Sequence, residues 1–200
     1  MVDWEKNFAI IVRTSSFSHL RDLYTGKADL GNAHENDPAF GHAVIILKIG
    51  DDLYYRGYRP TLADRGLREA LGGNDKSAVI DILRKGVTAE ICDERSMYQE
   101  VFQTALPGFV YHYLNYKKKE VDAIWTQVKQ DEEKEDKYYT LEPDTARQSG
   151  EFAEDSLVHN CVTWIIETQH VSVNRFLLKR VRNGNISQFA ENLHQTGDSL

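Results

Sequence analysis

The sequence has little cysteine: only Cys92 and Cys161 occur among its 200 residues. Two thiols can form one disulfide at most, which is too few for the framework of a small disulfide-stabilised secreted domain. No CxxC or HExxH spacing occurs, and the seven histidines are scattered along the chain. We therefore expect no zinc or other metal centre and no cofactor.

Long apolar runs are also lacking. No run approaches the roughly 20 residues that cross a bilayer, so no transmembrane segment is expected. The N-terminus, MVDWEKNFAIIVR, carries acidic residues early and has only about five apolar residues together, unlike a cleaved secretory signal. We expect the protein to be cytoplasmic in the producing cell, with export by a route that needs no cleaved signal left open.

An excess of basic charge is absent too. The formal net charge is −7 and the sequence pI is about 5.5, which argues against a nucleic-acid groove. The hydrophobic share of 41% and the charged share of 28% are typical of a globular protein with a substantial core. Without an internal repeat or a composition boundary, we expect residues 1–200 to form one domain.

Strand patterns dominate the first half of the chain. Residues 8–13 and 43–47 are rich in β-branched and apolar side chains, and the second run is apolar on both faces. It should therefore be a central strand covered on both sides. A turn at 50–52 predicts a return strand ending at Pro60. Further strands are predicted over residues 87–92, 109–116 and 138–141.

Helical spacing occurs between these strands, which makes the predicted fold class α+β. The predicted helices cover residues 17–24, 62–71, 97–105 and 120–130, while 78–83 fits a helix or a strand. The charge run at 131–137 is expected to be a solvated helix end or loop. Residues 142–155 are expected to be an exposed loop.

The most informative stretch is SLVHNCVTWIIE, residues 156–167. It places Cys161 at the head of a short apolar segment that predicts a buried helix, where backbone N–H groups and the helix dipole favour a thiolate. Far upstream, His42 opens the apolar strand 43–47. Our hypothesis is that Cys161 is a nucleophile and His42 its base. The alternative is a buried structural cysteine, the commoner fate of a lone cysteine before an apolar run, with a histidine that only caps or packs.

Neighbouring residues are weaker candidates. Asn160 should cap the helix rather than take part in catalysis. His159 lies two positions from Cys161 and should face elsewhere, which makes it a poorer base than His42. Cys92 precedes Asp93 and Glu94, whose charges disfavour a thiolate, so it is the poorer nucleophile. The tryptophans at 125 and 164 are expected in the core.

These features together resemble a known superfamily. Gly41-His42-Ala43 before an apolar strand, the hairpin ending YYRGYRP at 54–60, and Asn160-Cys161 opening a helix resemble the circularly permuted papain-like superfamily. That group includes permuted NlpC/P60 hydrolases and lecithin:retinol acyltransferase-like proteins. The resemblance spans about residues 41–167. It implies a permuted papain-like fold, with an antiparallel sheet packed against the cysteine helix, Cys161 as nucleophile and His42 as base.

The resemblance also implies a function. It predicts a cysteine amidase or peptidase that works through a thioester, with peptidoglycan peptide stems as substrate. The sequence pattern is also similar to that of effector toxins delivered by bacterial secretion systems. This similarity would imply a secretion-system or inhibitor partner. Lipid acyl hydrolysis or transfer is the alternative enzyme activity. A non-catalytic interaction module on the same fold is the other alternative, and it predicts a buried Cys161 with His42 out of reach.

Members of this superfamily usually have a third polar residue that orients the histidine, often from the neighbouring strand. Tyr55 and Tyr58 are available on the predicted return strand. A shift of one residue in hairpin register exchanges the residue that faces His42, so the sequence leaves this position open.

Overall fold

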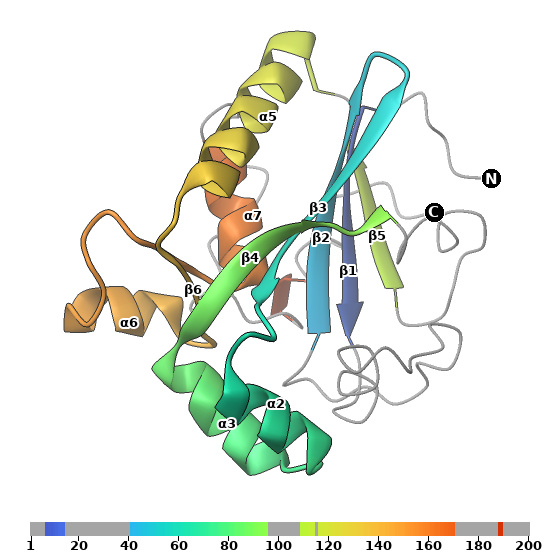
Figure 1. Ribbon diagram of the computed structural model, residues 1–200. Coiled ribbons are helices and arrows are strands. Elements are labelled where there is room, and N and C mark those ends of the chain that lie inside the picture. The colour runs from blue at the N-terminus through green and yellow to red at the C-terminus, as the bar shows by residue number, and fades with distance from the viewer. Residues whose placement is uncertain (1–6, 15–40, 96–108, 115, 171–187, 190–200) are drawn as a thin grey trace.

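The computed structural model describes residues 7–14, 41–95, 109–114, 116–170 and 188–189. Within them the chain is α+β (Figure 1), as the sequence predicts. The strands are β1 (Phe8–Thr14), β2 (Gly41–Ile49), β3 (Asp52–Pro60), β4 (Val87–Asp93), β5 (Phe109–Leu114), β6 (Lys137–Tyr139) and β7 (Leu157–His159). The helices are α2 (Arg65–Gly72), α3 (Lys76–Lys85), α5 (Lys118–Glu133), α6 (Pro143–Ser149) and α7 (Cys161–His170).

The strands form one sheet in the order β5-β1-β2-β3-β4-β6-β7. Strand β2 lies inside it, and its residues Ala43, Val44 and Ile45 are fully buried although they point alternately to both faces. The prediction of a central strand covered on both sides is confirmed. His42 precedes this buried run, and its backbone is positioned by pairing with Arg13 of β1.

The sheet is mixed, which corrects the expectation of a purely antiparallel one. Strand β6 pairs with β7 in parallel, and the other pairs are antiparallel. Parallel neighbours need a crossover connection, and α6 lies in it. The expected exposed loop over 142–155 was therefore wrong in part: Pro143 at the helix start has a compatible φ, and Gly150, with a φ of 72°, ends α6 in the left-handed region.

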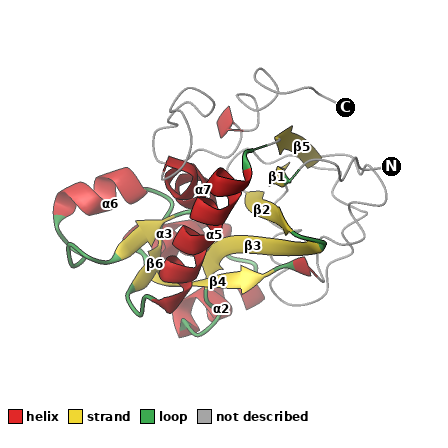
Figure 2. Cartoon of the chain, turned by 90° about the horizontal axis from the view of Figure 1, so that it is seen from above, coloured by secondary structure: helices red, strands yellow, loops and turns green. Residues whose placement is uncertain are grey.

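Helix α7 packs on one face of the sheet beside α5 (Figures 1 and 2). Its side chains Val162, Trp164 and Ile165 are fully buried against apolar residues of β2 and β3. Burial of such side chains contributes about 1.5–3 kcal/mol each. Trp164 Nε1 also donates to Asp131 Oδ2 of α5 at 2.9 Å. The helix is thus held by apolar packing and by a polar contact to its neighbour.

Asp131 also corrects the sequence analysis at one position, because the run 131–137 was expected to be solvated. Its side chain is buried and accepts a second hydrogen bond from Gln127. Elsewhere the ambiguous segment 78–83 is helical, within α3, and the helices expected over 17–24 and 97–105 lie outside the described residues.

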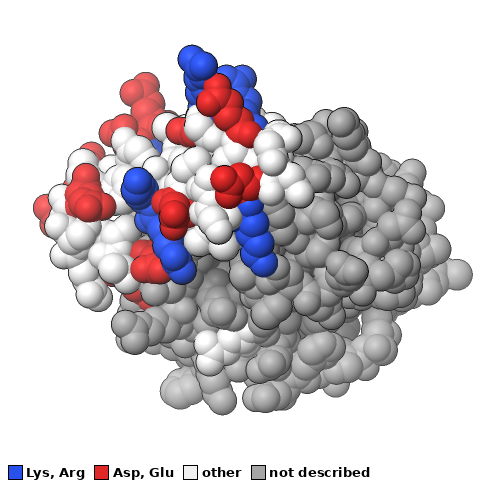
Figure 3. All heavy atoms as spheres, turned by 90° about the horizontal axis from the view of Figure 1, so that it is seen from below, with Lys and Arg blue, Asp and Glu red and all other residues white. Residues whose placement is uncertain are grey.

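Charged side chains of both signs lie beside one another over the described part of the face seen in Figure 3. Two ion pairs within α2 and α3, Arg65–Glu69 and Arg84–Asp81, follow this pattern. No helix among the described residues has the length and apolar character needed to cross a membrane.

Candidate active site

Cys161 is the first residue of α7, as predicted. The preceding Asn160 caps the helix: its Oδ1 accepts hydrogen bonds from the backbone N–H groups of Val162 at 3.1 Å and Thr163 at 3.0 Å. In return, Thr163 Oγ1 accepts from the Asn160 backbone N–H at 3.0 Å. This reciprocal cap fixes the helix start and matches the capping role expected for Asn160. The Cys161 side chain is 3% exposed.

His42 is held by a buried carboxylate. Its Nε2 lies 2.9 Å from Glu94 Oε1 and 3.1 Å from Oε2. Glu94 follows β4 directly and is 1% exposed, while His42 is 8% exposed. Because Nε2 faces the carboxylate, Nδ1 is the ring nitrogen left for another partner.

Gly57 makes this contact possible. It lies on β3, the strand between His42 and Glu94, opposite Val44 of β2 and Cys92 of β4. A Cβ at this position would lie 2.9 Å from His42 Nε2 and 2.7 Å from Glu94 Cδ, closer than real Cβ atoms approach. The two side chains therefore meet directly over a glycine. A glycine inside a strand is a known sign of such a close approach.

The structure brings Cys161 and His42 together, and the electrostatics of His42 reflect it. Burial lowers the pKa of the ring, but the Glu94 charge and hydrogen bonds with the Cys161 and Glu94 side chains outweigh it and raise the pKa to about 10. At neutral pH His42 is thus an imidazolium that contacts the Glu94 carboxylate and lies near the Cys161 side chain.

Glu94 is the residue that sequence reasoning missed. Tyr58 was one candidate for the orienting role, but its hydroxyl donates to the backbone oxygens of Tyr138 and Leu157, at 3.0 Å each. Tyr55 was the other, and its backbone oxygen instead accepts from the Glu94 N–H at 3.3 Å. The orienting group comes from the second strand away rather than the neighbouring one. The available sequence signal was Gly57, whose missing side chain permits this longer reach.

Two alternative reactive residues lie in other settings. His159 Nδ1 is 2.7 Å from Arg147 Nη2, and burial together with the charges of Arg147 and Lys134 lowers the pKa of His159 well below its ordinary value. Burial also raises the pKa of Cys92 to about 12, with Glu90 and Glu94 adding to the rise and Arg59 opposing it. The expectation that Cys92 is the poorer nucleophile stays a prediction. Both cysteines are free thiols.

No group of three His, Cys, Asp or Glu side chains within the described ranges is arranged to hold a metal ion. Comparison of the chain with protein-family models, with curated proteins and with solved structures found no match. The assignment of a function therefore depends on the geometry of the site and on its chemistry.

Proposed function

We propose that this chain is a cysteine hydrolase that cleaves an amide bond, on a circularly permuted papain-like variant of the α+β fold. The observation that carries the proposal is a single arrangement. The thiol at the start of α7 lies close enough to His42 to raise its pKa, and His42 Nε2 is held 2.9 Å from the buried Glu94 carboxylate. Nucleophile, base and orienting group in this order form the triad arrangement used in nucleophilic catalysis.

The three groups support a complete reaction. The Cys161 thiolate attacks the amide carbonyl carbon and forms the C–S bond, while the oxygen takes the negative charge. The backbone N–H of Cys161 would donate to this oxyanion, since Asn160 caps the N–H groups of the next two residues instead. Collapse breaks the C–N bond, and the leaving amine takes the proton of the His42 imidazolium.

Hydrolysis of the thioester completes the cycle. Neutral His42 removes a proton from water, the hydroxide adds to the thioester carbon, and the C–S bond breaks to return the thiolate. Glu94 holds the ring in one orientation and stabilises its charged form before and after each transfer. Glu94 therefore acts through His42 as a positioning residue.

The burial of Cys161 favours a different function, a non-catalytic interaction module on the same fold. That alternative predicts two features, a buried thiol and a histidine out of reach. The first is present, since Cys161 is 3% exposed. The second is not, because His42 contacts Glu94 and lies close enough to Cys161 for that side chain to raise its pKa. A hydrophobic core alone gives no reason for a buried His–Glu pair, because such pairs stabilise a fold no better than apolar residues of equal volume.

A substrate panel tests the proposal and separates the two enzyme activities. Purified protein is incubated with peptidoglycan stem peptides and with phospholipids, and products are followed by mass spectrometry. We expect amide cleavage that disappears in Cys161→Ala and His42→Ala while the fold, measured by circular dichroism, is retained. Release of fatty acid, again lost in both variants, would assign lipid acyl chemistry instead. Absence of turnover on both substrate classes, with Cys161 inert to alkylation, would support the interaction module.

A role as a delivered toxin is the cellular form of this proposal. Expression of the chain in the bacterial cytoplasm, or in the periplasm behind an added signal, tests where a target is reached. We expect growth arrest in the periplasm, where peptidoglycan lies, and none with Cys161→Ala. Arrest that persists with Cys161→Ala would contradict a toxic activity of this site.

A further inference from the structure

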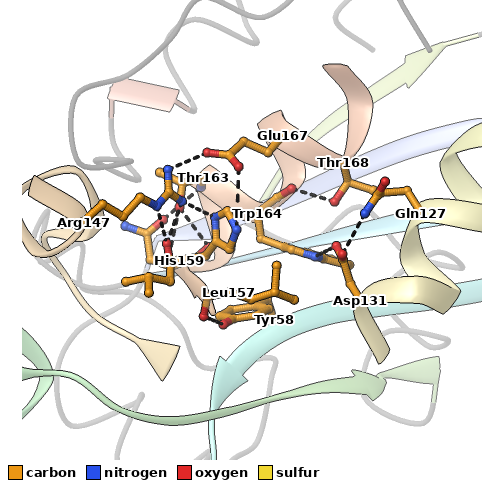
Figure 4. A network of polar contacts seen from close by, with 12 residues as sticks. Tyr58, Gln127, Asp131, Arg147, Leu157, His159, Thr163, Trp164, Glu167 and Thr168 are labelled. Carbon is orange, nitrogen blue, oxygen red and sulfur yellow. Dashed lines mark hydrogen bonds and ion pairs between the residues drawn. The ribbon is translucent and has the colours of Figure 1, made fainter. Parts of the chain in front are cut away.

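The Arg147 guanidinium joins strand β7 to helix α7, which begins at Cys161 (Figure 4). Arg147 of α6 donates from Nε and Nη2 to the Val158 carbonyl oxygen, at 2.9 and 2.6 Å. Its Nη1 donates to Glu167 Oε1 of α7 at 2.6 Å. A planar fork with several donors suits this combination of acceptors, and lysine could not reproduce it. We call Arg147, Val158, His159 and Glu167 the junction clamp.

The clamp depends on the protonation of His159. Arginine has no acceptor, so the contact between Arg147 Nη2 and His159 Nδ1 at 2.7 Å requires that Nδ1 accept. The ring proton then sits on Nε2, which faces Glu167 Oε2 at 3.7 Å. The clamp as built therefore contains a neutral histidine in one tautomer.

A second proton on His159 would oppose the clamp. It would place an N–H against the guanidinium, so two donors and two like charges would meet in a site where the histidine is 4% exposed. Lys134, beyond the end of α5, adds positive charge, and Tyr58 of β3 presents a neutral ring at 5.6 Å. Glu167 is the one counter-charge in the clamp, but its side chain is half exposed and already pairs with Arg147. The charges around a protonated His159 therefore favour opening of the junction clamp.

We propose that Arg147 is a positioning residue that fixes the junction between β7 and α7, and with it Cys161, and that acid opens this clamp by protonating His159. Its effect on Cys161 chemistry rests on the proposed function, whereas the clamp itself does not. The lowered pKa of His159 sets the direction: the clamp is closed at neutral pH and opens in acid.

Hydrogen exchange tests the clamp without any activity. Exchange of backbone amides in residues 157–166 is measured at pH 7 and corrected for intrinsic rates. We expect Arg147→Lys to exchange roughly tenfold or more faster there, because charge-assisted bonds are lost, with strand β2 unchanged. Arg84→Lys, which alters a half-exposed arginine paired with Glu142, is the matched control and should leave 157–166 unchanged. Equal exchange in wild type and Arg147→Lys would overturn the clamp.

His159→Asn tests the acid response, since its Oδ1 can accept where Nδ1 does and takes up no proton. Between pH 7 and pH 4 we expect exchange of 157–166 to accelerate in wild type and to change far less in His159→Asn. Alkylation of Cys161 slows in acid in both proteins as the thiolate is protonated, and it should slow more steeply in wild type than in His159→Asn. An identical acid response in wild type and His159→Asn would overturn the proposal. This comparison does not use Arg147→Lys, so it decides the question even if that variant fails to fold. If Cys161 is inert but the exchange results hold, the clamp stands and the hydrolase proposal fails.

Discussion

Glu94 reaches His42 from two strands away and lies 2.9 Å from its Nε2 directly over Gly57. The contact links the end of β4 to the start of β2 without any group of β3 between them. It places a buried carboxylate against Nε2 of the imidazole. The protonation state of His42 therefore depends on Glu94.

Replacement of Glu94 by glutamine should lower the pKa of His42 from about 10, because the amide keeps the size and an acceptor but removes the charge that stabilises the imidazolium. Turnover should fall roughly 10- to 100-fold. Nuclear magnetic resonance titration of the His42 ring measures the shift. Glu90→Gln is the matched control, because Glu90 is also on β4 but pairs with Arg59. A His42 titration unchanged in Glu94→Gln would contradict the role of the carboxylate.

Gly57→Ala should separate the two side chains, because its Cβ would occupy the space where they meet. We expect a loss of about 1–3 kcal/mol in the free energy of unfolding, as in overpacked cores, together with a lower His42 pKa. Gly72→Ala, at the last position of α2 with open space around it, is the control and should be neutral or stabilising. Chemical denaturation measures both. If Gly57→Ala were as stable as wild type, the His42–Glu94 contact would not require a glycine at position 57.

The alkaline dependence of stability should report the same pair. The folded pKa of His42, about 10, lies above its unfolded value near 6.5, so its contribution is complete below pH 6.5 and is lost as the pH rises through 10. Between pH 6.5 and 10, wild type should lose more than about 1 kcal/mol relative to Glu94→Gln. Urea unfolding at several pH values measures the difference. Parallel curves for the two proteins would be the contradictory outcome.

Loss of the α7 cap should affect Cys161 beyond its cost in stability. Asn160→Ala removes two hydrogen bonds at the helix start and should cost about 1 kcal/mol. Asp75→Ala removes the cap of α3 and should cost a similar amount, yet leave Cys161 unaffected. We therefore expect only Asn160→Ala to slow alkylation of Cys161. Equal alkylation rates in the two variants would mean that the cap does not position the thiol.

Local patterns predicted the elements that carry Cys161 and His42. The apolar run after Gly41 required a central strand, and the polar-to-apolar change at Asn160 marked a capped helix start. Glu94 could not be found in the same way. It is an acidic residue in an acidic segment, and its burial follows from a register across three strands that no local pattern encodes.

Local sequence patterns also failed to predict α6 and the burial of Asp131. Residues 142–155 contain loop-forming residues, but Arg147 has several tertiary partners that support a short helix there. Asp131 likewise belongs to a charged run, yet the indole N–H of Trp164 provides a partner for its burial. In both cases a contact between distant segments outweighed the local preference.

The proposed hydrolase activity requires that His42 activate Cys161. Alkylation of native protein by iodoacetamide, followed by mass spectrometry at each cysteine from pH 5 to 10, tests it most directly. Cys92 is the internal control, since burial raises its pKa to about 12. We predict that Cys161 reacts faster than Cys92 already at neutral pH and that His42→Ala abolishes this difference. If Cys161 reacts no faster than Cys92, and His42→Ala changes nothing, Cys161 is a structural cysteine and the account is wrong.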